Sequence, residues 1–235
     1  MKKILLIVTM LVLGCSVASA SPLMDYSAGK VAVDVASRPN QSNDWSGLTS
    51  YGGKGGNYDL GLTFGLGDKF ALQIAHQKAN SKLFTAANQT LTVSNGNTET
   101  TANQINILYK LDKNFAAFAG YTHSRTDLTF SAGSIIKGRY FFVGSSAQGK
   151  NANGYQIGFV ASAPLGDRLT GYAVAGVGNR IENFEFGVGY ALAANTELNL
   201  YYRSTKHKDL EFHNITDYKY DLKISGIGYG LTFKF

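Results

Sequence analysis

The sequence predicts an all-β protein built as a closed, antiparallel, up-and-down β-barrel that crosses a membrane with about ten strands. Three observations lead to this fold class. Apolar residues recur at every second position through most of the chain, so each segment has one apolar face and one small or polar face. Short polar turns alternate with long polar stretches along the chain. Only 16% of the residues are charged and 12% are aromatic, whereas an average soluble domain has about 25% charged residues.

Residues 1–20 are predicted to be a cleaved signal peptide. A positively charged start and an apolar stretch at 4–13 precede a small-residue cleavage site formed by Ala18 and Ala20. The apolar stretch is too short for a helical anchor, because a helix needs about 20 residues to cross a bilayer. The sequence therefore predicts one mature domain, residues 21–235.

Cys15 leaves a second interpretation of the N-terminus open. Residues 12–15 are similar to a bacterial lipobox, in which Cys15 would carry lipid and become the first residue. Cleavage after Ala20 would instead remove the only cysteine, and with Lys2 and Lys3 it would lower the formal net charge from +6 to +4. The basic residues do not cluster, so we expect no nucleic-acid partner and instead expect basic loops near anionic lipid headgroups.

The predicted strands follow from alternation, beginning with the valines of 30–36. Later segments with the same period place apolar residues on one face and Gly, Thr or charged residues on the other. They lie at 58–65, 105–111, 155–159, 184–192 and 227–235. The last is the clearest, because aromatic or aliphatic residues alternate there with Gly, Thr and Lys.

The connections set the expected strand number and orientation. Short polar turns are expected at 67–69, 112–114, 166–168 and 193–196. Long polar loops are expected at 38–56, 79–102, 126–152 and 205–220, with a tight connection near 178–182. These nine connections join ten strands and place both termini at the end with the short turns. Eight strands are the alternative, and the pair flanking 178–182 and the first strand decide between the two.

The second row of each strand favours a barrel lumen over the interior of a β-sandwich. It is rich in Gly, Ala, Ser and Thr, as suits a water-facing channel wall. It also contains scattered charges, which we expect to face the lumen: Asp34, Asp59, Lys110, Glu185, Arg203 and Lys234. Aromatic residues lie near segment ends, where two interfacial girdles are expected: Tyr58, Tyr109, Phe115, Tyr121, Tyr155, Tyr202 and Phe233.

The C-terminal segment carries the most specific pattern in the chain. Its alternating residues are Ile227, Tyr229, Leu231, Phe233 and the terminal Phe235. This pattern resembles the C-terminal recognition signal of Gram-negative outer-membrane β-barrel proteins, which the barrel-assembly machinery reads. Over residues 27–235 the chain resembles the small porin-like and opacity-type barrels, the OmpA-like membrane-domain family. The resemblance implies a monomer in the outer membrane, in contact with its lipid and lipopolysaccharide.

Catalytic and metal-binding groups have no specific spacing, so we expect no enzyme, no cofactor and no metal. A protease-like rim site would need His and Asp pairs, for which the candidates are His123 with Asp127, His207 with Asp209, and His213 with Asp217. His207 and His213 are also too weakly patterned to predict a metal site. His76 is the remaining histidine.

The expected function is that of a porin-like, non-catalytic outer-membrane barrel with surface-exposed loops. Many inward glycines would leave a narrow passive pore. The alternatives are a plugged barrel that acts as an adhesin, a surface-binding or a structural protein, and a barrel enzyme acting on lipopolysaccharide or surface peptides. The loop at 126–152 contains apolar residues that could extend the barrel as a hairpin, enter the lumen or form a binding patch: Ile135, Ile136, Tyr140, Phe141 and Phe142.

Overall fold

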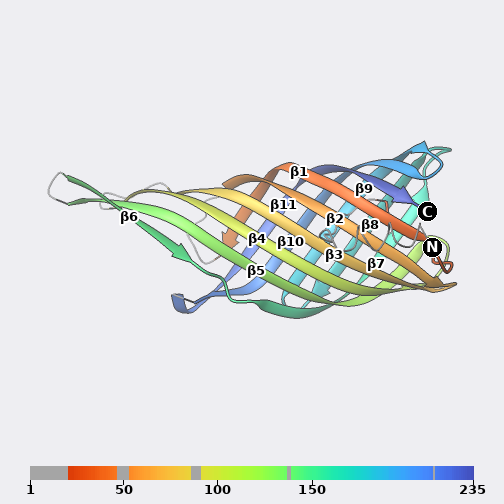
Figure 1. Ribbon diagram of the computed structural model, residues 1–235, viewed down its shortest axis with the longest axis horizontal. Helices are drawn as coiled ribbons and strands as arrows, with labels where there is room; N and C mark the ends of the chain where they lie inside the picture. The colour runs from red at the N-terminus through yellow and green to blue at the C-terminus, as the bar shows by residue number, and fades with distance from the viewer. Residues whose placement is uncertain (1–20, 47–52, 86–90, 137–138, 214) are drawn as a thin grey trace, which may run out of the picture.

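The computed structural model describes residues 21–46, 53–85, 91–136, 139–213 and 215–235. Almost all of them belong to strands, and Figure 1 shows the strands wound into one elongated barrel. The strands are β1 (Val31–Ser46), β2 (Gly53–Gly67), β3 (Phe70–Thr85), β4 (Leu91–Lys110), β5 (Phe115–Ile136), β6 (Arg139–Ala147), β7 (Ala152–Pro164), β8 (Leu169–Gly178), β9 (Ile181–Ala193), β10 (Thr196–Phe212) and β11 (Ile215–Lys234). No helix among the described residues is long and apolar enough to span a membrane.

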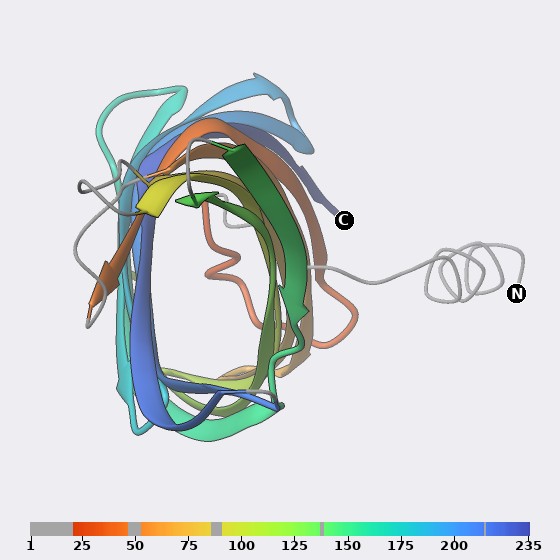
Figure 2. The same ribbon diagram turned by 90° about the vertical axis from the view of Figure 1, so that its left-hand side faces the viewer.

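Ten of these strands close into a ring. Each pairs antiparallel with its neighbours in chain order, and β1 pairs with β11 to complete the circle. Viewed along its axis, the barrel has an oval outline (Figure 2). Strand β6 is not part of the ring, because it pairs only with the distal half of β5, whereas β7 pairs with the proximal half. The predicted up-and-down barrel of ten strands is confirmed.

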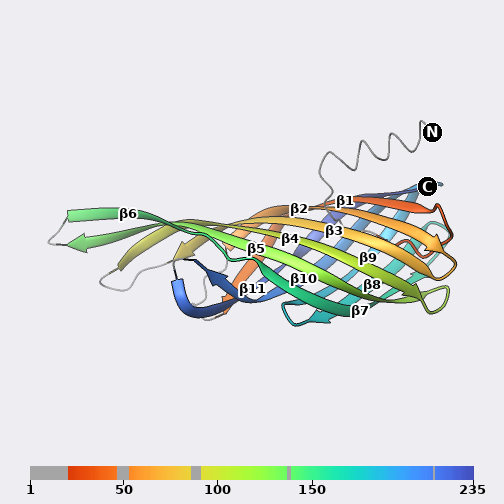
Figure 3. The ribbon, with the colours of Figure 1, turned by 60° about the horizontal axis from the view of Figure 1, so that its bottom comes forward.

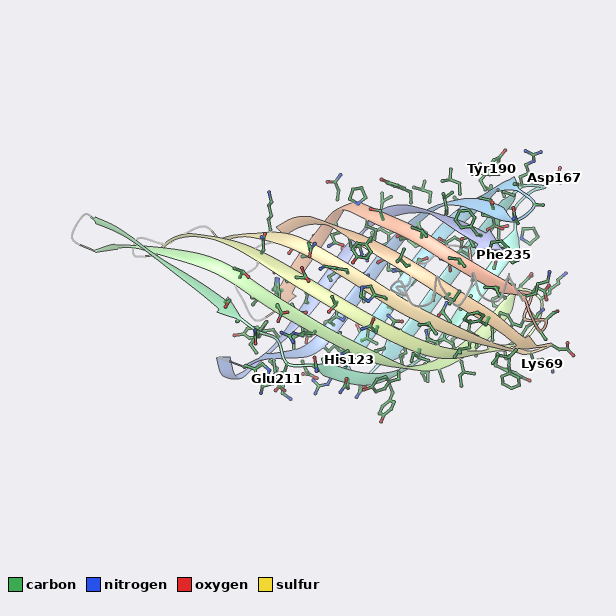
Figure 4. The ribbon with its side chains drawn as sticks, viewed as in Figure 1. Lys69, His123, Asp167, Tyr190, Glu211 and Phe235 are labelled. Carbon is green, nitrogen blue, oxygen red and sulfur yellow. The ribbon has the colours of Figure 1, made fainter. Side chains whose placement is uncertain are left out.

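The four short turns all lie at one end of the barrel, which we call the short-turn end. Figure 4 shows Lys69, Asp167 and Tyr190 near this end, together with Phe235 at the end of the chain. The first turn of the ring needs a glycine, because Gly67 has a φ of +148° and its nitrogen donates to the carbonyl oxygen of Tyr26 at 3.0 Å. The opposite end, which carries the long hairpins, is the long-hairpin end.

Strands continue far into the stretches expected to be long loops. A bilayer needs about 9 to 11 residues per strand, whereas β4 has 20 and β5 has 22. The ladder between β3 and β4 runs without interruption from Phe70–Tyr109 to Thr85–Ser94. The predicted strand ends were therefore wrong here, because Thr, Asn and Ser continue a two-residue alternation when water covers the outer face.

The stretch 126–152 forms a hairpin extension, one of its three expected alternatives. Residues 128–136 of β5 pair with β6, and this hairpin projects furthest from the ring in Figure 3. The side chains of its apolar residues, including Ile135 and Phe141, lie outside the described residues.

The wall narrows toward the long-hairpin end. Strands β8 and β9 end at a tight connection near Gly178 and Ile181, while the flanking strands continue.

Above this connection the tip of β10 crosses to the β6–β7 connection, where Gly149 bridges to Phe212. The nitrogen of Lys150 also donates to the carbonyl oxygen of Glu211 at 2.8 Å. A bulge at Asp209, with a φ of +52°, redirects β10 for this contact.

An apolar belt surrounds the barrel at the level of the short strands. Its exposed aliphatic residues include Ile105, Ile107, Ile157, Val188, Leu198, Leu200 and Ile227. Aromatic residues border it on both sides, as the sequence predicts for two girdles. Phe70 packs on Tyr109 toward the short-turn end, and Tyr121 packs on Tyr155 toward the other side.

Candidate functional site

The lumen of the barrel is the candidate functional site, and the first feature in it is an N-terminal plug. We use this name for residues 21–27, which lie inside the ring of strands (Figure 2). Tyr26 is fully buried against Leu108, Phe118 and Val160 of the inner wall. Leu23 and Ser21 are buried as well. The plug therefore fills the lumen at the short-turn end.

A tight turn carries the chain from the plug into β1. The nitrogen and hydroxyl of Ser27 donate to Asp25 Oδ1 at 3.1 and 2.6 Å, which holds the pKa of the Asp25 carboxyl below its usual range. Gly29 then takes a φ of +87°, a conformation that other residues rarely adopt. This turn reverses the chain at the rim, so the plug points into the barrel.

A polar network surrounds the start of the plug. The nitrogen of Ser21 donates to Asn199 Oδ1 at 2.9 Å. Asn199 Nδ2 donates to Thr232 Oγ1, and Thr232 donates to Asp34 Oδ1 at 2.8 Å. Lys234 pairs with Glu197 at 2.7 Å. The base of the lumen is thus a connected set of polar groups drawn from β1, β10 and β11.

A charge cluster crosses the middle of the lumen, formed by Arg38, Asp59, Glu185 and Arg203. Arg203 Nη1 lies 3.0 Å from Asp59 Oδ2, and its Nε donates to Glu185. Arg38 Nε lies 3.5 Å from the same Asp59 oxygen. All four side chains are buried. Two acids face two bases, so the formal charge of the charge cluster is zero, which favours burial of ions that would be costly alone.

The inward glycines are not the source of an open channel. A Cβ on Gly228 would overlap Tyr201 and Arg38, and a Cβ on Gly158 would overlap the ring of Phe118. The glycines leave room for large side chains from neighbouring strands. The expectation that inward glycines mark open space is therefore wrong at these two positions, because larger side chains of neighbouring strands occupy that space.

An apolar collar fills the lumen beyond the charge cluster. Its described members are Trp45, Ala79, Leu128, Ala147, Ala152, Leu210, Phe212, Leu222 and Ile224. The rings of Trp45 and Phe212 lie 6.4 Å apart. The collar sits where the wall narrows, so it closes the lumen on the side opposite the plug.

Two cavities of the described part of the barrel are prominent. An inner cavity of about 50 Å³ lies between plug and collar, lined by Pro22, Asp34, Gln77, Gln104 and Arg203 among others. A wider outer vestibule of about 620 Å³ lies on the distal parts of β2–β5, lined by residues that include Asn80, Lys82, Glu99, Asp127 and Thr129. The inner one has room for a few waters only.

Five of the six charges expected in the lumen form two groups, and Lys110 lies apart from both. Asp59, Glu185 and Arg203 meet in the charge cluster, whereas Asp34 and Lys234 lie in the network at the base. Lys110 lies at the short-turn end, where its backbone nitrogen donates to the carbonyl oxygen of Lys69 at 2.7 Å. The structure does not bring Lys110 into the charge cluster.

Three contributors to the filled lumen were missed at the sequence level. Arg38 stands before Pro39 in a polar stretch without alternation, so nothing placed it inside the barrel. The plug has no strand period either, and only the apolar character of Leu23, Met24 and Tyr26 could have indicated burial. Tyr201 is a smaller omission, because its inward parity with Asn199 and Arg203 follows from the alternation of β10.

The structure does not assemble the histidine and aspartate pairs considered for catalysis. His207 is fully buried beside the lumen, while Asp209 pairs with Arg180 on the surface. His123 Nδ1 lies 2.6 Å from Asn153 Oδ1, and Asp127 pairs with Arg125. The side chain of Asp217 lies outside the described residues, and no group of metal-ligating side chains occurs among those that are described.

A closed antiparallel ring with an apolar belt, two aromatic girdles and a polar lumen defines a transmembrane β-barrel of the outer-membrane kind. No protein-family model and no curated protein sequence matches the chain.

Solved structures of outer-membrane barrels are similar to it. The outer-membrane protease OmpT from Escherichia coli has 12% identity and a TM-score of 0.49 over 93% of this chain and 99% of its own. The translocator domain of NalP from Neisseria meningitidis has 11% identity and a TM-score of 0.49 over 87% and 88%. Neisserial surface protein A has 13% and 0.41 over 88% and 99%. The likeness concerns barrel architecture, which the strand pairing of this chain establishes by itself.

Proposed function

We propose that the protein is an integral barrel of the bacterial outer membrane and that its lumen is closed at rest. The short-turn end faces the periplasm and the long-hairpin end faces outward, as is general for such barrels. The apolar belt contacts lipid. Basic side chains beyond the distal girdle, including Lys78, Lys206 and Lys208, stand at the level of lipopolysaccharide phosphates. The predicted signal peptide, residues 1–20, lies outside the described part of the chain.

The observation that carries this proposal is the filling of the lumen at three successive levels. The plug occupies the base, the charge cluster the middle and the apolar collar the distal level. The cavity beside the plug has a volume of about 50 Å³. A path for hydrated ions needs a continuous file of water, which the apolar collar and Tyr26 interrupt. In this proposal the resting barrel is therefore non-conducting.

The working surface of a closed barrel is its distal half. Seven ring strands or their hairpins continue past the belt and carry mixed polar and charged residues on their outer face. The vestibule opens on this half and offers amide, hydroxyl and charged groups of both signs, such as Asn80, Thr98, Lys82 and Glu99. This chemistry suits a polar partner at the cell surface, so we assign the protein a surface-binding role.

A narrow passive pore is the second candidate function. Its support is that noncovalent contacts, such as the hydrogen bond from the Ser21 nitrogen to Asn199, hold the plug inside the lumen, and that polar groups line much of the cavity beside the plug. Displacement of the plug would then be the opening step. In this candidate the charges of the lumen, such as Asp34 and Arg203, would set the selectivity.

Conductance across planar bilayers distinguishes the two functions. We expect residues 21–235, refolded in detergent and checked by a heat-dependent gel shift, to give no discrete current steps. A chain that begins at Ser27 lacks most of the plug, and the closed-barrel proposal predicts that it also stays silent because the collar remains. Steps from the shortened chain alone would establish the plugged pore. Steps from residues 21–235 would overturn the closed lumen.

Assembly is a separate part of the proposal, and it rests on the C-terminal strand. The assembly machinery would read Phe235 together with the alternating residues that precede it, from Ile227 onward. Phe235→Ala is expected to lower the amount of folded protein in outer-membrane fractions several-fold, without loss of refolding in detergent. Phe184→Ala, which removes a comparably exposed belt ring from β9, is the matched control. Equal membrane levels for both variants would overturn this assignment.

A further inference from the structure

The first residue of the plug lies in a buried polar pocket at the base of the lumen. Ser21 is 1% exposed, and its nitrogen donates to Asn199 Oδ1 at 2.9 Å. Lys234 Nζ reaches the Ser21 hydroxyl at 3.5 Å. An ordinary peptide nitrogen has one N–H, and the bond to Asn199 satisfies it fully.

The same pocket contains a carboxylate oxygen that lacks a partner. Glu197 Oε1 accepts from Lys234 Nζ at 2.7 Å, but Glu197 Oε2 is buried with no hydrogen-bond partner among the described residues. Gly189 shows how close this oxygen is to the plug, because a Cβ built there would lie 2.9 Å from Ser21 Cβ and 3.1 Å from Glu197 Oε2. Buried acceptors without a donor are rare in folded proteins, so this oxygen indicates a missing cation or donor.

The charged groups of the pocket point to a cation. Two carboxyl groups, Asp34 and Glu197, are joined to it through Thr232, Asn199 and Lys234. Lys234 is the one basic side chain of this network among the described residues, and it bonds only one of the two Glu197 oxygens. A positive charge with N–H donors beside Ser21 would supply the partner that Glu197 Oε2 lacks.

We propose that the pocket is a binding site for the α-ammonium group of Ser21, which exists only after the predicted cleavage behind Ala20. Hydrolysis of the Ala20–Ser21 bond by an export peptidase adds the hydroxyl of water to the Ala20 carbonyl carbon and a hydrogen to the Ser21 nitrogen, which then takes up a proton. The resulting ammonium has three N–H donors in place of one. Asn199 keeps its bond, and Glu197 Oε2 accepts a second.

The consequence is that cleavage behind Ala20 fixes the plug in the lumen. Before cleavage the Ser21 nitrogen is a neutral amide, and the pocket keeps a carboxylate oxygen without a partner among the described residues. After cleavage the ion pair between the Ser21 ammonium and Glu197 holds the plug in the lumen, because charge-assisted hydrogen bonds are stronger than neutral ones. This inference rests on the closed lumen proposed above, to which it adds the event that completes the closure.

Single-cysteine labelling tests the proposal, because residues 21–235 contain no cysteine of their own. Leu23→Cys is the reporter, since Leu23 is buried in the seated plug. The rate of modification by a polar maleimide is measured on the refolded barrel for residues 21–235 and for residues 19–235, which retain Ser19 and Ala20. We expect at least tenfold faster labelling of the longer chain. Mass spectrometry of the native protein must also show Ser21 as the first residue, and a lipidated Cys15 would overturn the proposal.

Two variants separate the ammonium from a general effect on folding. Glu197→Gln keeps the shape of the side chain but removes its charge, and it should accelerate labelling of the 21–235 chain to the rate of the longer one. Glu182→Gln is the matched control, because it makes the same change in an exposed carboxylate that pairs with Lys208 away from the pocket, and it should leave the plug seated. Acetylation of the Ser21 amine at neutral pH, followed by mass spectrometry, should be slow in residues 21–235 and fast in Glu197→Gln, because a paired ammonium is not nucleophilic.

The outcomes distinguish this proposal from the closed lumen itself. Equal labelling and acetylation rates in all chains overturn the ammonium site, and silent bilayers would then still support a lumen closed by the apolar collar. Slow labelling of residues 21–235 together with current steps would overturn the closed lumen and leave the ammonium site standing. Labelling accelerated equally by Glu197→Gln and Glu182→Gln would assign the effect to a general change of the barrel and also contradict the proposal.

Discussion

The belt-level half and the distal half of the barrel have opposite polarity, although the same strands build both. At belt level, Leu200 of β10 faces outward and is 55% exposed, while Asn199 beside it is buried in the lumen. Further along the same strand, Lys206 faces outward to pair with Asp221, and Phe212 packs inward in the apolar collar. The distal half thus has a polar outer face and an apolar interior, like a soluble barrel. The belt-level half has an apolar outer face and a polar interior.

Strand β11 shows the same exchange without a break in the strand. Its outward residues change from Tyr229 and Ile227 to Ser225, and its inward residues change from Gly228 to Ile224. The medium on each face explains the exchange, since lipid covers the outer face at the belt and water covers it beyond. A strand whose apolar residues face outward in one part and inward in the next part therefore marks the place where a barrel leaves the bilayer.

The largest expected effect comes from removing a charge of the belt-level lumen. Arg203→Met leaves Asp59 and Glu185 buried without their shared partner, which is expected to cost about 3–5 kcal/mol. Unfolding in urea, followed by the heat-dependent gel shift in micelles, measures it. Lys206→Met is the control from the distal half, where loss of a half-exposed pair should cost about 0–1 kcal/mol. Equal losses would contradict the difference between the halves.

A cavity in the apolar collar should destabilise the distal half by a similar or smaller amount. Leu222 is 1% exposed, so Leu222→Ala is expected to cost about 2–5 kcal/mol through lost contacts and a cavity. The loss should appear as faster amide exchange in the distal parts of β10 and β11, with exchange at the belt unchanged. Leu200→Ala, on the lipid-facing side, is the matched control, and an equal increase of exchange there would show that the collar is not a separate core.

Placing a lysine on the outer face should distinguish the halves more sharply. Tyr229→Lys puts a charge against lipid near the middle of the belt, with an expected cost of about 2–4 kcal/mol. Ser225→Lys puts the same residue two alternations further along the outward row of β11, where water covers the wall, and should be nearly neutral. Unfolding in lipid vesicles measures both, and a neutral Tyr229→Lys would remove the evidence for a lipid-facing belt.

The smallest expected effect concerns pH at the tip of β10. Lys150 Nζ donates to Glu211 at 3.2 Å, which holds the pKa of the Glu211 carboxyl below its ordinary range. Because this pKa is lowered in the folded state, the stabilisation is present at neutral pH and is lost as the pH falls below about 4. Faster hydrogen exchange of the amides near residues 148–150 is expected at acid pH, after correction for the intrinsic pH dependence of exchange. Glu211→Gln should open equally at both pH values, and a pH effect that persists in it would have another source.

Most of the fold could be predicted from the sequence, because a two-residue period needs no knowledge of tertiary contacts. The short turns and the parity of Asp59, Glu185 and Arg203 followed from that period alone. The distal strand ends could not be predicted, since Thr and Asn serve equally well in loops and in strands whose outer face meets water. Within 205–224 the apolar residues move from the outward-facing to the inward-facing positions of the strands. This exchange would have indicated the apolar interior of the distal half.

The closure of the lumen was harder to predict than its lining. Counting inward glycines gave the volume that each strand leaves free, but not the side chains that neighbouring strands place there, such as Tyr201 beside Gly228. The plug depends on a chain reversal at Gly29 and on a pocket drawn from β1, β10 and β11. These residues are far apart in the sequence, and no local pattern records their contact.

The most direct test of the reversed polarity is a depth profile along the outward row of β11. Single cysteines at Lys223, Ser225, Ile227 and Tyr229, in residues 21–235 reconstituted in vesicles, would carry spin labels. Their collision rates with oxygen, which concentrates in lipid, and with a water-soluble nickel complex are then compared. The account predicts oxygen-dominated collisions at positions 229 and 227 and nickel-dominated collisions at positions 225 and 223. Nickel-dominated collisions at all four positions would contradict a membrane-spanning belt, and oxygen-dominated collisions at all four would contradict a water-exposed distal half.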